Sequence, residues 1–141
     1  MGYRIIYTEG KLRMPADKAK NFMLDLVCAI KENSHSEATI QACNKYIHNQ
    51  TDSKFFAVMD AWNSMFLFEI KNRYLEIEYN DIANDGRWYS DDVLLFVNAY
   101  APYASENEFL GFVGEDMYMW SYVFDGRGHV NVTKPKIDWL G

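Results

Sequence analysis

The chain has 141 residues and a formal net charge of -6 at pH 7, which suits a single domain with one hydrophobic core. Its content of 49% hydrophobic and 16% aromatic residues excludes the composition of a disordered chain. The segment Met1–Ile6 has no long apolar run, and charged residues interrupt every later apolar stretch, so we expect a cytoplasmic protein without a membrane span.

An extended pattern of β-branched and aromatic residues predicts a first strand over residues 3–14, with a turn or bulge at Glu9-Gly10. Pro15 suits the first turn of a helix that we expect to continue to Glu32. Apolar residues recur there at the i, i+3, i+4, i+7 spacing of one helical face. That predicted face consists of Ala19, Phe22, Met23, Leu26, Val27 and Ile30.

Two further helices are expected before the next strand. The second helix should begin at a capping box formed by Ser34 and Glu37 and end at the polar stretch 48–52. Thr51 or Asp52 should cap a shorter third helix. The predicted core-facing residues are Ile40, Cys43 and Ile47 on the second helix, and Phe55, Val58, Met59 and Trp62 on the third.

From Met65 the apolar period changes from about 3.6 to 2, which predicts a hairpin with a turn at 71–73. The second strand of this hairpin would carry an acidic face that includes Glu76 and Glu78. Ser90 should cap a fourth helix, and Pro102 should end it. The core-facing residues expected on that helix are Val93, Val97 and Tyr100.

The segment from Asp81 to Asp92 partly follows the spacing of a calcium-binding loop, with Gly86 where an EF-hand makes its sharp turn. However, Ala83 replaces a ligand, Asp92 stands where a bidentate glutamate is usual, and the preceding segment is a predicted strand. A turn followed by a capped helix is therefore the preferred interpretation, and cation binding stays an open alternative.

The last third predicts three short antiparallel strands over residues 109–113, 117–124 and 129–139, with Pro135 placing the third at an edge or bulge. Gly126 and Gly128 should occupy a hairpin turn with positive φ. On the middle strand, alternation puts four aromatic side chains on one face, which we expect to pack as core rather than to stack on nucleic-acid bases. They are Tyr118, Trp120, Tyr122 and Phe124.

The expected fold is therefore α+β. It comprises an antiparallel sheet of about five or six strands with three to four helices packed on one face, in the order β-α-α-α-β-β-α-β-β-β. The whole chain, 1–141, is expected to form one domain.

Negative charge is concentrated in the second half of the chain. Between Glu69 and Gly126 there are three basic residues, Lys71, Arg73 and Arg87, against twelve acidic ones, so this segment carries -9. Nucleic-acid binding draws most of its affinity from lysine and arginine, and a surface of this kind attracts basic partners instead. We therefore expect no direct binding to nucleic acid.

Residue types that usually carry catalysis or bind metals are sparse. Cys28 and Cys43 fall among apolar residues on predicted helices, where free cysteine usually behaves as a buried hydrophobe. The histidines, His35, His48 and His129, are scattered and have no zinc-binding spacing. No glycine-rich phosphate-binding motif occurs. We expect no metal, no cofactor and no catalytic residue.

The segments Gly114-Glu115-Asp116 and Trp120-Ser121-Tyr122-Val123-Phe124-Asp125-Gly126 resemble the C-terminal hairpin of small uncharacterised proteins of bacteria and their mobile elements. The resemblance covers about the last third of the chain, together with the preceding Ala101-Pro102-Tyr103. It implies a context of small, acidic, cytoplasmic accessory proteins, many of which are inhibitors or immunity proteins. It transfers no catalytic residue.

These observations predict a non-enzymatic accessory or inhibitor protein that docks a basic or mixed surface of a protein partner through an acidic face. The expected context is an anti-defence (anti-CRISPR-like) or immunity factor of a phage or mobile element. One alternative is a small-molecule-binding protein or enzyme with a pocket between the helices and the aromatic sheet face. Another is a homo-oligomer formed through an exposed strand edge. The candidate partner-binding residues are Glu76, Glu78, Asp81, Asp85, Trp88, Glu115 and Asp116.

Overall fold

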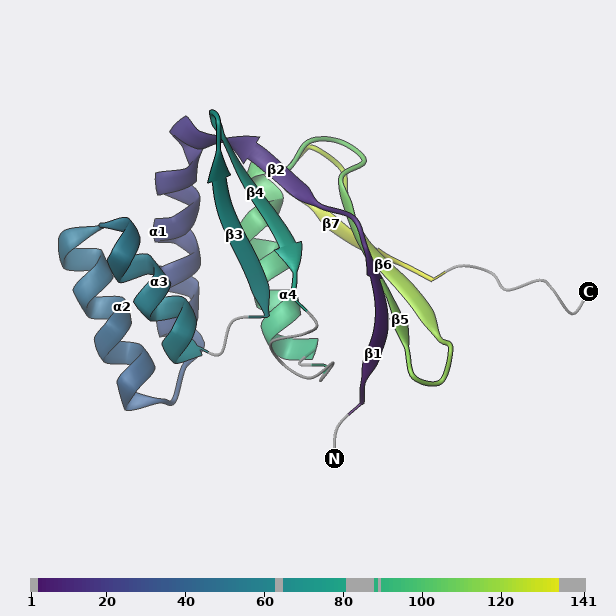
Figure 1. Cartoon of the computed structure of the whole chain (residues 1–141), viewed down its shortest axis with the longest axis horizontal. Helices are drawn as coiled ribbons and strands as arrows, with labels where there is room; N and C mark the ends of the chain where they lie inside the picture. The colour runs from purple at the N-terminus through teal and green to yellow at the C-terminus, as the bar shows by residue number, and fades with distance from the viewer. Residues whose placement is uncertain (1–2, 63–64, 81–87, 89, 135–141) are drawn as a thin grey trace, which may run out of the picture.

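The computed structural model describes residues 3–62, 65–80, 88 and 90–134, and within them the α+β class is confirmed (Figure 1). Four α-helices, one short 3₁₀ helix and seven strands follow one another in these residues. They are β1 (Ile5–Glu9), β2 (Leu12–Pro15), α1 (Ala16–Asn33), α2 (Glu37–Asn49), α3 (Asp52–Trp62), β3 (Phe66–Lys71), β4 (Tyr74–Tyr79), α4 (Ser90–Tyr100), η1 (Ala101–Tyr103), β5 (Phe109–Gly114), β6 (Met119–Phe124) and β7 (Val130–Thr133).

The strands form two antiparallel sheets rather than the single sheet expected from the sequence. One has four strands in the order β1-β5-β6-β7, and the other has three in the order β2-β4-β3. The first predicted strand is divided at Gly10, so that β1 joins one sheet and β2 joins the other. Gly10 has φ +98°, and a Cβ there would lie 2.3 Å from the carbonyl oxygen of Phe109. Only glycine fits this change of sheet.

Helices α1 and α4 cover the three-stranded sheet, while α2 and α3 pack on the side of α1 away from the four-stranded sheet (Figure 1). The predicted apolar face of α1 is confirmed, because all six of its residues are buried. On α4 the predicted Val93, Val97 and Tyr100 are buried, and Phe96 joins them by stacking on Phe66 at 3.8 Å between ring centroids. One part of the hydrophobic core therefore lies between these helices and the three-stranded sheet.

The prediction for α2 was wrong in two details. Its N-cap is Ser36, whose Oγ accepts a hydrogen bond from the Thr39 amide at 3.3 Å, whereas Ser34 accepts from the Ser36 amide. The buried face is Thr39, Cys43 and Tyr46, which confirms Cys43. Ile47 is partly buried and packs against the core, whereas Ile40 is only partly buried and is replaced on this face by Thr39. Thr39 can be buried because its hydroxyl donates to the carbonyl of Ala61 on α3 at 2.9 Å.

The four-stranded sheet supplies the other side of the core. Trp120, Tyr122 and Phe124 are buried, as predicted, whereas Tyr118 precedes β6 and is 42% exposed. Aromatic contacts join the two sheets, since Phe112 lies 5.0 Å from Tyr79 between ring centroids. One buried cluster thus draws on both sheets and all four helices.

Within the described residues, no helix is long and apolar enough to cross a membrane. Both cysteines are free thiols. Burial raises the pKa of the Cys43 thiol, which disfavours the reactive thiolate.

Candidate partner-binding surface

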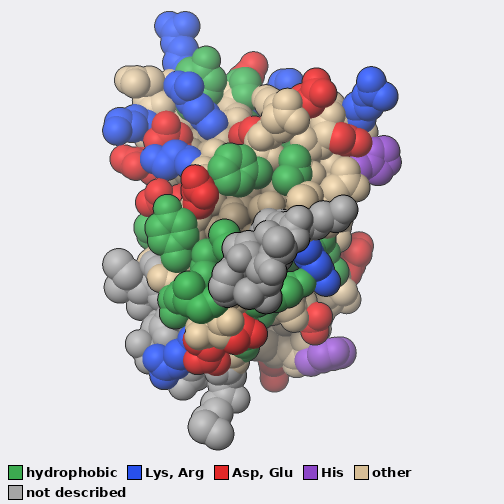
Figure 2. Space-filling model, turned by 90° about the vertical axis from the view of Figure 1, so that its right-hand side faces the viewer, with side chains coloured by type: hydrophobic (Ala, Val, Ile, Leu, Met, Phe, Trp, Pro, Cys, Tyr) green, Lys and Arg blue, Asp and Glu red, His purple; other side chains and the backbone are tan. Residues whose placement is uncertain are grey.

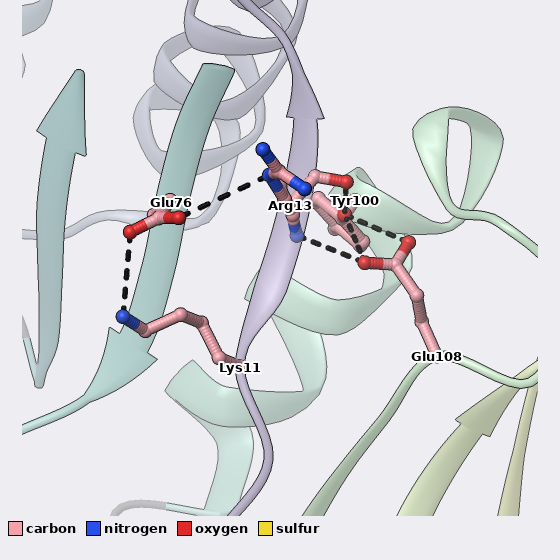
Figure 3. Close-up of polar contacts among 5 residues, drawn as sticks. All are labelled: Lys11, Arg13, Glu76, Tyr100 and Glu108. Carbon is pink, nitrogen blue, oxygen red and sulfur yellow. Dashed lines mark hydrogen bonds and ion pairs between the residues drawn. The ribbon is translucent and has the colours of Figure 1, made fainter. Parts of the chain in front are cut away.

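Glu76, predicted as part of an acidic face, is paired with Lys11, which precedes β2, and with Arg13 of β2. Its carboxylate lies 3.3 Å from Lys11 Nζ and 3.9 Å from Arg13 Nε (Figure 3). The Arg13 guanidinium also lies 3.7 Å from the centroid of the Tyr74 ring. Glu78 is exposed on the same strand. The outer surface of the three-stranded sheet therefore carries charges of both signs.

The carboxylate of Glu108 holds the two sheets together where β2 approaches the start of β5. It accepts hydrogen bonds from the Arg13 amide at 2.8 Å and the Tyr100 hydroxyl at 3.0 Å (Figure 3). It also accepts one from the Ser105 amide at 2.7 Å. Burial, and then the charge of Glu108, raise the pKa of Tyr100 far above its usual value. Tyr100 is therefore a neutral donor, and this group of contacts is structural.

Glu115 and Asp116, two further predicted contact residues, anchor the N-terminal segment to the β5–β6 turn. Asp116 accepts hydrogen bonds from the Tyr3 hydroxyl and from the Tyr118 amide, and Glu115 accepts from the Arg4 amide at 3.3 Å. The Tyr3 hydrogen bond is the main cause that lowers the pKa of Asp116. Partial burial and then Asp116 raise the pKa of Tyr3 to about 12. Both acids nevertheless remain exposed.

The remaining predicted residues do not extend this acidic surface. Trp88 packs against the core, with its ring centroid 4.9 Å from Phe112 and 5.0 Å from Trp120. Asp81 and Asp85 lie outside the described residues, as does most of the loop considered for calcium binding. The structure thus does not bring the seven candidates together as one described patch.

The four-stranded sheet has a second face that the sequence analysis did not identify. Twelve large hydrophobic side chains are exposed in the described residues, and seven of them belong to this sheet or its β5–β6 turn. Figure 2 views the side on which Figure 1 places this sheet, and it shows hydrophobic side chains gathered across the middle. The seven residues are Ile6, Tyr7, Phe109, Met117, Tyr118, Met119 and Val132. Val132 pairs with the buried Tyr122 and therefore projects from the other side of the sheet.

Strand pairing explains which side chains share this outer surface. Tyr7 pairs with Val113, which pairs with Met119, and in the next row Glu9 pairs with Gly111. Paired residues project from the same side of a sheet. We call this surface the open face and define it by Tyr7, Glu9, Phe109, Gly111, Val113, Met119, Ser121 and Thr133.

A hollow of about 200 Å³ lies in the open face at Gly111. A Cβ on Gly111 would lie 3.8 Å from both the Glu9 Cβ and the Phe109 ring, so these two side chains border the hollow. Glu9 is the only ionisable side chain among the described lining residues apart from Tyr7. Its carboxylate forms no ion pair or hydrogen bond with another described residue.

A larger groove, of about 720 Å³, runs between α1 and α4. Its polar lining includes Asp25, Asp91 and Asp92, and burial followed by the nearby Asp91 raises the pKa of Asp92. The small-molecule alternative expected a pocket against the aromatic face of the sheet, but Trp120 and Tyr122 of that face do not line this groove. Among the residues with described positions, no three histidine, cysteine or acidic side chains are placed to hold a metal ion.

The sequence did not point to the open face, because its strongest patterns are the acidic charge of the second half and the aromatic side of β6. The pattern that indicates this face is on β5, where Phe109, Gly111 and Val113 recur with a period of two on the side opposite the buried residues.

Comparisons with protein-family models, curated proteins and solved structures gave no match to this chain.

Proposed function

We propose that this chain is a non-enzymatic protein-binding protein, an accessory or inhibitor, that contacts its partner through the open face. The observation that carries the proposal is the exposure of the large hydrophobic side chains Tyr7, Phe109 and Met119 on one side of one sheet. Aromatic and methionine side chains are enriched at protein interfaces. Tyr7, Phe109 and Met119 are 56%, 37% and 43% exposed and lie on neighbouring strands.

A partner with a basic or mixed surface fits the charges around this face. Glu9 lies within it, and Glu115 and Asp116 occupy the turn at the end of its β5 and β6 strands. One described lysine contributes there, since Lys134 Nζ lies 5.8 Å from the centroid of the Tyr118 ring. Opposite charge across an interface accelerates encounter and selects partners.

The narrower proposal is an anti-defence or immunity factor encoded by a phage or mobile element. Its support is the resemblance of the C-terminal hairpin to small proteins of bacteria and mobile elements. A binding inhibitor would need an accessible surface rather than a catalytic constellation. The open face meets that requirement.

Affinity capture from the native host tests the proposed surface when matched variants are compared. Tyr7→Ser combined with Met119→Ser should abolish recovery of a stoichiometric protein partner, since apolar anchors carry much of the binding energy of an interface. Phe56→Ser is the control, because Phe56 is 43% exposed but lies on α3. Equal recovery by the double variant and the wild type would reject the open face as the binding surface.

The α1–α4 groove supports a second candidate, a small-molecule-binding protein or enzyme. Its volume falls in the range of about 300–1,000 Å³ typical of ligand sites, and Asp92 has a raised pKa within it. A cationic metabolite would complement its three aspartates. Ligand-induced thermal shifts that disappear in Asp92→Asn would favour this candidate, whereas shifts that persist would argue against the groove.

A further inference from the structure

The Gly111 hollow has the size and chemistry of a receptor for one side chain. We propose that it receives an arginine side chain of the protein partner, with Glu9 as counter-ion and the Tyr7 and Phe109 rings as walls. This inference rests on the proposed function and specifies the chemistry by which the partner is recognised.

The size of the hollow favours a side chain over a separate small molecule. Its volume of about 200 Å³ is below the range of about 300–1,000 Å³ typical of small-molecule pockets. Gly111 supplies the space, because it contributes no side chain between Glu9 on β1 and Ser121 on β6, its partners in the sheet. A partner side chain can therefore reach the strand backbone here.

The charge of the hollow favours a cation. Among the residues that the structure describes, no lysine, arginine or histidine lines the hollow and none is a counter-ion of Glu9. A partner that covered Glu9 with a neutral or acidic group would remove water from the carboxylate without replacing its interactions. A cationic group of the partner would replace the interactions that the Glu9 carboxylate loses with water.

The aromatic walls favour arginine over lysine. The Phe109 ring lies against the site where a Gly111 Cβ would stand, and Tyr7 is in the adjacent row of the sheet. A guanidinium group is planar and weakly hydrated, so it can stack on an aromatic ring while it donates two hydrogen bonds to a carboxylate. An ammonium group offers no such flat surface.

Two substitutions test separately the negative charge of Glu9 and the empty volume at Gly111. Glu9→Gln removes the counter-ion but keeps the size of the side chain. Gly111→Val fills the hollow, and the strand should accept it because φ of Gly111 is outside the left-handed region and the nearest atoms are 3.8 Å from the added Cβ. Glu106→Gln, which changes an exposed acid outside the open face, is the matched control.

The test is an NMR titration of the full chain with Nα-acetyl-arginine N-methylamide and with the matching derivatives of citrulline and lysine. The arginine derivative should give saturable shifts at the amides of Glu9, Gly111 and Ser121. The citrulline derivative, which is neutral and nearly isosteric, should bind at least about tenfold more weakly, as should lysine. Glu9→Gln and Gly111→Val should abolish the shifts with a folded spectrum, and Glu106→Gln should preserve them.

Equal binding of arginine and citrulline, or unchanged binding by Gly111→Val, would overturn the inference. Arginine binding that appears only after removal of residues 135–141 would also overturn it, because the chain itself would then be the occupant. Partner capture distinguishes the two proposals. If capture depends on Tyr7 and Met119 but not on Glu9 or Gly111, the proposed function stands and the arginine site fails; if it depends on none of them, both fail.

Discussion

The carboxylate of Glu76 lies 3.3 Å from the Nζ of Lys11, although 65 residues separate the two along the chain. Because of this contact, the acidic residues concentrated in the second half of the chain do not all form an unpaired acidic surface. Strand β4 lies beside β2, so Lys11 and Arg13 balance part of the charge of the segment 69–126 at Glu76. Glu78 on β4 stays exposed, and on the side of the four-stranded sheet Glu9, Glu115 and Asp116 are exposed to a partner as well.

Glu76→Gln should lower the free energy of unfolding by only about 0.5 kcal/mol, since Lys11 and Arg13 are both about half exposed and water screens their attraction to Glu76. Urea denaturation at low and high salt measures the change, which should shrink as salt rises. Glu78→Gln, on the same strand but exposed and without a described ion pair, should have no effect. Loss of partner binding in Glu76→Gln would contradict the assignment of Glu76 to structure.

Gly10→Ala should destabilise the protein by more than about 3 kcal/mol, because both the positive φ and the collision with the Phe109 carbonyl oppose a Cβ. Gly128→Ala is a close control. Gly128 has a similar φ of +93° but open space around it, so its substitution should cost only about 1 kcal/mol of backbone strain. Thermal unfolding of both variants compares the two costs, and equal destabilisation would contradict the close packing assigned to Gly10.

Glu108→Ala should cost about 2 kcal/mol, because the amides of Arg13 and Ser105 lose their acceptor where the two sheets meet. The Tyr100 hydroxyl keeps the Arg13 carbonyl as an acceptor at 3.2 Å, which limits the loss. Glu106→Ala, an exposed acid two residues away, should be neutral. Urea denaturation measures both, and equal stability of the two variants would remove Glu108 from the link between the sheets.

The Tyr3–Asp116 hydrogen bond should make stability depend on pH in the acid range. The folded pKa of Asp116 is lowered from its ordinary value of 3.8, so the stabilisation is fully present above that pH and is lost as pH falls through the folded pKa. The difference in Tm between wild type and Asp116→Asn should therefore be constant from about pH 5 to 7 and shrink below about pH 4. The difference in Tm between wild type and Tyr3→Phe should shrink in the same way below about pH 4. A Tm difference that stays constant down to about pH 2 would contradict this contact.

Local patterns were sufficient for much of the fold. The apolar spacing on α1 identified all six of its buried residues, and alternation on β6 identified Trp120, Tyr122 and Phe124 as core. A turn or bulge within one strand was expected at Glu9-Gly10, but the chain instead passes there from one sheet to the other. The need for glycine at position 10 comes from the Phe109 carbonyl, which is distant along the chain. Division into two sheets was therefore beyond local reasoning.

The candidate surface was harder to predict than the fold. Strand alternation shows that Phe109 and Val113 share a side, but only the packing of the helices determines which side is covered. The pairing of Glu76 with Lys11 likewise requires β2 and β4 to be neighbours. The sequence identified acidic residues, and the tertiary arrangement decides which of them a partner can reach.

Site-specific photo-crosslinking in the native host tests the central claim most directly. A benzophenone amino acid at position 119 should give one heavier covalent adduct that contains a different protein, and the same residue at position 56 should give none. Both positions are 43% exposed, so accessibility to the reagent is matched. An adduct formed from position 56 alone, or an adduct of twice the mass of the chain from position 119, would contradict a hetero-partner on the open face.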